Sequence, residues 1–151
     1  MPQSPYDIYL ESRIESAEPI QLIRLLYQGA LDAVREARRH LASGDIAARS
    51  QAVSKAFEIL TELTTSLDRT RGGEIATRLV QLYDYLQRRL LEANARQQDE
   101  PLAEVLGLLT TLGEAWQEIG NTSRAPEPAP GLWAQASGAE TGDLAVHAWS
   151  A

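Results

Sequence analysis

Between Pro19 and Gly120, apolar residues recur at intervals of three and four, and glycine or proline marks each interruption of the pattern. This spacing is typical of amphipathic α-helices, because one helical turn takes about 3.6 residues. Strands alternate every second residue and do not fit the pattern. The sequence therefore predicts four helices, whose apolar stripes cover residues 22–41, 53–67, 75–93 and 102–119.

The interruptions carry residues that end one helix and begin the next. Gly44 suits the left-handed position after a helix, and Asp45 can cap the helix that follows. Residues 68–73 read as a turn with a flexible Gly-Gly corner, and Asp99 is a plausible cap before Pro101 in a first turn. Helices joined by such short turns run antiparallel, so we predict an all-α, up-and-down four-helix bundle.

The bundle is expected to span residues 19–121, between two segments of different character. Residues 1–18 form a short N-terminal extension with no predicted helix. Residues 122–151 are rich in Ala, Pro and Gly and lack apolar periodicity, so we expect a disordered tail. Trp133 and Trp149 stand out in that tail, as either a short docking motif or unstructured residues.

Composition argues against nucleic-acid-binding, secreted and membrane-spanning proteins. The formal net charge is −7, and the arginines are scattered among acidic residues, so no basic stripe is available for nucleic acid. The N-terminus lacks the basic segment and apolar run of a secretion signal. No apolar run approaches the ~20 residues that span a bilayer. We therefore expect a cytoplasmic protein that binds no nucleic acid and does not insert into a membrane.

No constellation of catalytic or metal-binding residues is visible. The chain has no cysteine, and its two histidines, His40 and His147, form no Glu-x-x-His pair of the kind that holds metals in bundles. No serine or threonine has a histidine or lysine at motif spacing. Gly72-Gly73-Glu74 follows a helix and lacks the Gly-Lys-Ser/Thr ending of a phosphate-binding loop. The sequence predicts a binding protein without cofactor or metal, and not an enzyme.

The helices carry more apolar residues than a stripe of about 100° requires. The surplus residues are Ile59, Leu63, Val80, Leu91, Leu108 and Leu112. They could meet the first helix, the N-terminal extension or a second copy in a homodimer. Alternatively, they leave grooves in which another amphipathic helix can lie, a common mode of peptide recognition. The residues thus indicate a helical bundle that binds a helical peptide.

A more specific resemblance lies between Gly72 and Asn94. This segment holds, in order, a Gly-Gly-Glu-Ile turn, Leu-Tyr-Asp-Tyr, Arg-Arg-Leu and Ala-Asn. It resembles the bacterial flagellar secretion chaperones of flagellin, the FliS family, as do residues 21–30, the turn at 43–45 and Ala115-Trp116. The resemblance covers about Tyr6 to Ile119. The chain departs from the family in having Glu-Pro rather than Ser-Pro before the first helix, and in its longer tail.

The resemblance implies a function in flagellar assembly. Members of the family hold the C-terminal segment of flagellin in the cytoplasm, prevent premature polymerisation and deliver the subunit to the membrane export gate. The six surplus residues would then edge the flagellin grooves. Tyr6 and Tyr9 match positions implicated in docking to the gate, although they could equally cap the core.

Two other functions stay open on the residues alone. The bundle could carry a different flagellar or type III secreted subunit. It could also be a structural protein that dimerises through its apolar flanks and carries no client. An enzyme is the least supported alternative.

Overall fold

The computed structural model describes residues 4–14 and 19–124 of the 151-residue chain. This part of the chain is all helical, and the elements are α1 (Pro5–Ile14), α2 (Pro19–Ser43), α3 (Ile46–Thr65), α4 (Arg69–Arg96) and α5 (Glu100–Arg124). None of these helices is long and apolar enough to cross a membrane. Residues 122–124 of the predicted disordered tail belong to α5, and the rest of that tail, with Trp133 and Trp149, lies outside the described residues.

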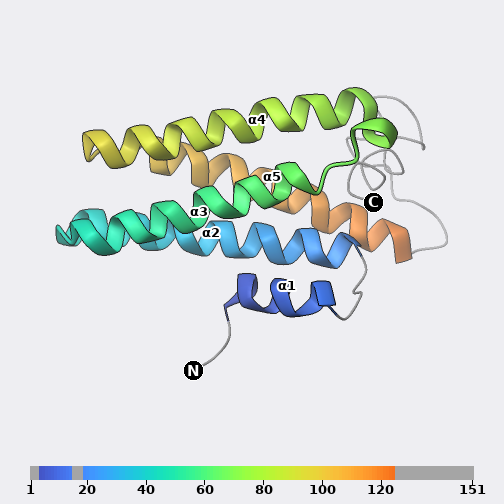
Figure 1. Ribbon diagram of the computed structural model, residues 1–151, viewed down its shortest axis with the longest axis horizontal. Helices are drawn as coiled ribbons and strands as arrows, with labels where there is room; N and C mark the ends of the chain where they lie inside the picture. Colours follow the sequence, from blue (N-terminus) through green and yellow to red (C-terminus); the bar gives the residue numbers. More distant parts are fainter. Residues whose placement is uncertain (1–3, 15–18, 125–151) are drawn as a thin grey trace.

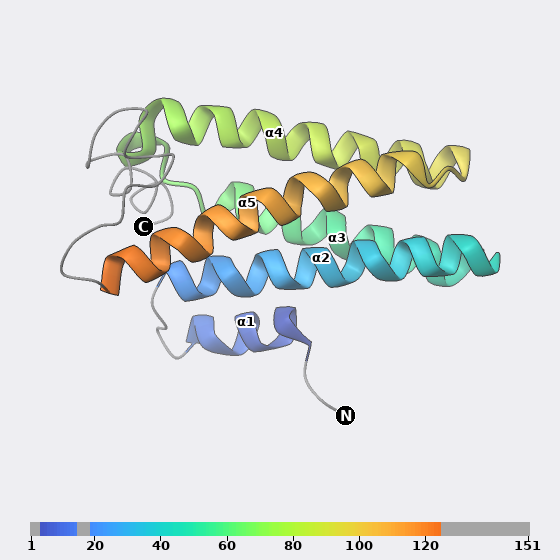
Figure 2. The same ribbon diagram turned by 180° about the vertical axis from the view of Figure 1, so that it is seen from behind.

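Helices α2 to α5 form the predicted bundle, and successive helices run in opposite directions (Figures 1 and 2). Helix α2 packs against α3 and α5, and α4 packs against the other side of both, so the four helices enclose one core. Their apolar stripes fill it with Leu26, Leu60, Leu86 and Leu109, each at most 1% exposed. The prediction of an all-α four-helix bundle is confirmed.

The N-terminal segment differs from the prediction, because α1 is a ten-residue helix that packs on the outside of α2 (Figure 1). Its start is capped reciprocally. The Asp7 amide donates to Ser4 Oγ at 3.2 Å, and the Ser4 amide donates to Asp7 Oδ2 at 3.3 Å. Pro5 sits in the first turn, where its missing N–H costs nothing. The sequence Ser-Pro-Tyr-Asp is thus a helix start that the apolar pattern alone did not reveal.

The turns between helices follow the predicted chemistry with one difference. Gly44 has a positive φ of 78°, and the Asp45 carboxylate accepts from the Ala48 amide at 3.1 Å, as predicted. Asp68 caps the amides of Thr70 and Arg71, both at 3.0 Å. This cap starts a helical turn inside the segment expected to be an open turn, and Gly73 then breaks the helix with a φ of 53°.

Two polar links hold the end of the bundle at which α2 meets α3 and α4 meets α5. The Asp99 carboxylate, predicted to cap α5, instead binds the Arg38 guanidinium of α2 through both oxygens, at 2.8 and 2.9 Å. The Arg38 guanidinium lowers the pKa of this carboxyl below its usual value. Arg49 of α3 is 4% exposed and donates to the side-chain oxygen of Asn94 at 2.9 Å.

At the other end, a chain of hydrogen bonds crosses the core. The hydroxyls of Tyr27 in α2 and Tyr83 in α4 lie 2.5 Å apart, and Trp116 Nε1 of α5 donates to the Tyr27 hydroxyl at 3.2 Å. All three side chains are buried. Burial raises the pKa of both tyrosines above its ordinary value, because a phenolate would be poorly solvated there. Helices α2, α4 and α5 are therefore joined by polar atoms deep in an apolar core.

We predict that Tyr27→Phe lowers the free energy of unfolding by about 1–3 kcal/mol, because it takes away a hydroxyl on which two buried polar groups converge. Urea unfolding followed by circular dichroism measures this change. Tyr85→Phe is the matched control, since its hydroxyl binds Glu104 at an exposed site, and it should shift stability by less than about 0.5 kcal/mol. Equal effects of the two variants would contradict the prediction.

Candidate functional site

Helix α1 rests on the seam between α2 and α3, and a glycine makes this close approach possible. A Cβ placed on Gly29 of α2 would lie 3.3 Å from Ile59 Cδ1 of α3 and 3.3 Å from Tyr6 Cβ of α1. That spacing is tighter than ordinary van der Waals contact, so a larger residue would require its neighbours to shift by a few tenths of an ångström. Gly29 thus marks the point where three helices meet.

The tyrosines of α1 face the bundle. Tyr9 is 3% exposed, and its hydroxyl donates to Glu62 Oε1 of α3 at 2.5 Å. Tyr6 is half-buried and stacks on Tyr9, with ring centroids 6.0 Å apart. Ile8 and Leu10 are instead 39% and 41% exposed. Helix α1 is therefore held by its tyrosine face and presents two aliphatic side chains to solvent.

Two of the predicted client-binding residues lie on the seam that α1 occupies. Ile59 and Leu63 are both 0% exposed. The chain itself therefore covers both residues, which is the alternative in which surplus apolar residues meet other parts of the same chain. Ile59 lies where α1 and α2 approach closely, since a Cβ on Gly29 would be 3.3 Å from both Ile59 Cδ1 and Tyr6 Cβ, and Leu63 belongs to the core cluster.

The next two predicted residues lie on the seam between α3 and α4. Val80 and Leu91 share a face of α4 with Gln87, whose amide donates to the Phe57 carbonyl at 3.0 Å and to Thr61 Oγ1 at 2.9 Å, both on α3. Val80 is partly buried against the core, whereas Leu91 is 52% exposed. Leu91 is thus an apolar side chain on the bundle surface.

The last two predicted residues lie on the seam between α4 and α5. Leu108 and Leu112 follow Glu104 by one and two turns, and Glu104 accepts from Tyr85 at 2.6 Å and from Arg89 at 2.8 Å, both on α4. Both leucines are partly buried against the core. The six residues are therefore distributed over three seams and do not line one groove.

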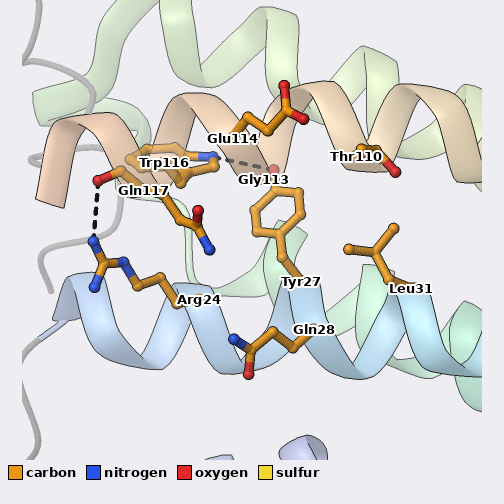
Figure 3. Close-up of a pocket in the computed structure, with 9 residues that line it drawn as sticks. All are labelled: Arg24, Tyr27, Gln28, Leu31, Thr110, Gly113, Glu114, Trp116 and Gln117. Atoms are coloured by element: carbon orange, nitrogen blue, oxygen red, sulfur yellow. Dashed lines mark hydrogen bonds between the residues drawn. The ribbon is translucent and has the colours of Figure 1, made fainter.

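Sequence reasoning missed a cavity of about 120 Å³ between α2 and α5 (Figure 3). The rings of Tyr27 and Trp116 form part of its lining, and Arg24 closes one end by donating from Nη2 to the Gln117 carbonyl at 3.0 Å. The Nε atom of Arg24 is buried without a hydrogen-bond partner. The other lining residues are Gln28 and Leu31 of α2 and Thr110, Gly113 and Glu114 of α5.

No sequence signal could have brought these residues together, because Arg24 and Gln117 are separated by 93 positions along the chain. The described residues contain no group of three or more His, Cys, Asp or Glu side chains that could hold a metal ion. What the surface of the described chain offers is helical seams with half-buried apolar residues, which suit a helical peptide.

Comparison with known proteins agrees with this reading. A family model described as flagellar protein FliS matches residues 2–123. The flagellar secretion chaperone FliS of Salmonella typhimurium is 47% identical over 113 residues, which cover 74% of this chain and 84% of the relative. FliS of Bacillus subtilis is 32% identical over 122 residues, which cover 81% and 90%. FliSB of Pseudomonas aeruginosa is 35% identical over 114 residues, which cover 76% and 90%.

The match to the family model extends over α1 and nearly all of the bundle. The chain therefore belongs to the FliS family of flagellar proteins.

Proposed function

We propose that this chain is a cytoplasmic export chaperone that binds the C-terminal segment of flagellin, prevents its premature polymerisation and delivers it to the flagellar type III export gate. The names of its relatives, flagellar secretion chaperones, support a role in handling a secreted flagellar subunit. The function is binding, without catalysis or a cofactor.

The client would bind as a helix along the seams that carry the surplus apolar residues. A segment that is disordered when free becomes helical as its apolar face is buried, and this ordering costs a few kcal/mol. Fully burying one leucine contributes roughly 1.5–3 kcal/mol, so a few such contacts offset the cost. Leu91 is exposed in the free chain and is ready to make one of them. Val80, Leu108 and Leu112 would flank the client on the neighbouring seams.

The observation that carries the proposal is the position of α1. This helix covers the side of the bundle where the proposed client residues Ile59 and Leu63 are buried, and it is held there by Tyr9 and Gly29. A client helix would reach Ile59 by taking the place of α1. The free chaperone would thus keep its own client site covered, and α1 would compete with flagellin for the seam.

The same movement links the client to the export gate. Tyr6 and Tyr9, the proposed docking residues, face the bundle while α1 is seated. Once flagellin displaces α1, both rings become accessible to the gate. Only the loaded chaperone would then dock. The alternative, in which the two tyrosines serve solely to complete the core, keeps them buried in both states.

A first experiment tests client binding at the α3–α4 seam. Leu91→Asp should weaken the affinity for a flagellin C-terminal peptide by about tenfold or more, because it places a charge where an apolar contact is expected. Calorimetry measures the affinity, and Gln81→Asp, an exposed position of the same helix, is the matched control. Both variants should keep the wild-type melting temperature. If Leu91→Asp binds as tightly as Gln81→Asp, the client lies elsewhere.

A second experiment tests the competition with α1. Tyr9→Phe removes the hydrogen bond to Glu62 and should loosen α1 by about 1 kcal/mol. The flagellin peptide should then bind up to about fivefold more tightly, because less free energy is needed to displace the helix. Ile8→Ala, at an exposed position of α1, should leave the affinity unchanged. Weaker binding by Tyr9→Phe would show that Tyr9 contacts the client directly.

A third experiment tests gate docking. The chaperone loaded with flagellin peptide should bind the cytoplasmic domain of the export gate at least about tenfold more tightly than the free chaperone. The double variant Tyr6→Ala, Tyr9→Ala should still fold and bind the peptide but lose this gain. Ile46→Ala, exposed on α3, is the control. Loss of folding in the double variant would favour the alternative in which the two tyrosines complete the core.

A further inference from the structure

The chain continues beyond α5 with a segment that the family match does not include. The match to the family model ends at residue 123, and the described residues end at Arg124. Residues 125–151 carry two of the three tryptophans of the protein, Trp133 and Trp149. Tryptophan is enriched among the residues that contribute most to binding, because its ring buries a large apolar area. The place of each tryptophan along the segment limits what it can contact.

A proline-rich stretch separates α5 from the first of these tryptophans. Residues 125–130 read Ala-Pro-Glu-Pro-Ala-Pro, and Gly131, Leu132 and Trp133 follow. Prolines at alternate positions favour the polyproline II conformation, which acts as a semi-rigid spacer and rises about 3.1 Å per residue. At that rise the spacer carries the apolar Leu132-Trp133 pair about 25 Å from the end of α5.

The end of α5 lies beside the start of α2 and the end of α1 (Figures 1 and 2). Arg24, near the start of α2, donates to the Gln117 carbonyl of α5. Arg124 follows Gln117 by about 10 Å along the helix, which brings it level with the start of α2. A spacer that begins there can pass the end of α2 and reach α1.

An apolar patch lies on the α1 side of this end. Tyr6 of α1 approaches Gly29 of α2, and Leu10, one turn after Tyr6, is nearer to the start of α2 and is 41% exposed. Leu22 and Leu25 precede Gly29 by two turns and one turn, on the same face of α2, and both are partly buried. Leu10, Leu22 and Leu25 together are called the α1–α2 patch.

The orientation of α1 sets Leu10 apart from Ile8, its other exposed aliphatic residue. Tyr9 donates to Glu62 of α3 and the ring of Tyr6 stacks on that of Tyr9, so both rings face α3. At about 100° per residue, Leu10 lies about 40° from Tyr6 in the direction away from Tyr9, on the α2 side. Ile8 lies about 160° from Leu10 and so faces away from α2.

The length of the spacer selects the α1–α2 patch. Helix α2 packs against both α1 and α5, so two helix spacings of about 8–10 Å separate these helices. Together with the distance along α5, this places the patch about 20 Å from Arg124. Tyr85, also exposed, binds Glu104, which is about 30 Å from Arg124 along α5. The exposed Ile46 and Leu91 lie still closer to the far end of the bundle.

We propose that the segment after α5 is an intramolecular latch, in which Leu132 and Trp133 dock on the α1–α2 patch and hold α1 on its seat. Burying a tryptophan side chain removes about 150–250 Å² from water, a large addition to the contacts of a ten-residue helix. The docking does not depend on the proposed function. Within that function, the latch raises the free energy that a client needs to displace α1.

Hydrogen exchange of the client-free chain tests the latch. In Trp133→Ala, the backbone amides of α1 should exchange at least about threefold faster, because the helix leaves its seat more often. Trp149→Ala is the matched control, since it removes the same ring from the same segment beyond the reach set by the spacer. It should leave the exchange of α1 at the wild-type rate. Wild-type exchange of α1 in Trp133→Ala, or equal acceleration in both variants, would overturn the inference.

Disulfide trapping locates the docked segment, because the chain has no cysteine of its own. Ala134→Cys is combined with Gln21→Cys, an exposed position one turn before Leu25, or with Gln81→Cys, an exposed position of α4. In a glutathione buffer the first pair should form its disulfide at least about tenfold more readily. Adding Trp133→Ala should remove most of that preference. A preference that survives Trp133→Ala would reflect the tether alone and would contradict docking.

A double-mutant cycle tests the contact itself. Leu10→Ala and Trp133→Ala should each accelerate the exchange of α1, and the double variant should exchange little faster than the faster single variant. Ile8→Ala replaces Leu10→Ala in the control cycle, where any effects should be additive. Additive effects in both cycles would remove Leu10 from the contact and overturn the inference. None of these measurements uses flagellin, so the latch and the proposed function can fail independently.

Discussion

The Tyr27 hydroxyl connects three helices of the bundle inside its core. It lies at hydrogen-bond distance from Tyr83 of α4 and accepts from Trp116 of α5. Apolar stripes can slide or rotate against one another at small cost, but a buried hydroxyl that loses its partners cannot. This chain of hydrogen bonds therefore fixes how α2 sits relative to α4 and α5. Tyr27 and Trp116 also line the α2–α5 cavity, so this part of the cavity wall is held in place by the same hydrogen bonds.

With α2 fixed by its α5 side, its opposite side is free to hold α1. The two sides of α2 are held by different kinds of interaction. The core side is held by buried polar groups on three helices, whereas α1 is a short helix anchored through Tyr9, Glu62 and the close approach at Gly29. An isolated helix of ten residues is marginal in water, so α1 depends on this seat for its structure. Such an element belongs to the low-stability end of a fold, and in the proposed function a client helix would displace it without unfolding the bundle.

Much of this architecture follows from local sequence. The apolar period predicts the four helices of the bundle. Gly44 correctly indicates the left-handed turn and Asp45 the helix cap, because turns and caps depend on neighbouring residues. Helix α1 was missed because its signal is the Ser4–Asp7 capping pair rather than an apolar stripe. The use of Asp99 was missed because its partner, Arg38, comes from another helix. Long-range pairing of this kind overrides a local preference whenever it offers a stronger acceptor or donor.

The candidate site was harder to predict for the same reason. A helical wheel correctly shows that Ile59 and Leu63 extend the stripe of α3, but it cannot show that both are fully buried in the folded chain. It also cannot find the α2–α5 cavity, whose walls come from residues about 90 positions apart. Whether a residue is buried, and whether a cavity forms, depends on how two helices pack together. The apolar pattern of one helix does not contain that information.

The distribution of apolar residues over three seams suits a carrier better than a single deep groove would. A chaperone must hold its client firmly and yet release it at the gate without unfolding itself. Contacts spread along a wrapped segment contribute modestly at each seam, and the segment can leave one seam at a time, so no single step requires the whole binding free energy. In the proposed function, α1 would return to its seat beside Ile59 as the seams empty, and would oppose rebinding. In the proposed function, the apolar seams of a rigid bundle would retain the client, and a covering helix of marginal stability would favour its release.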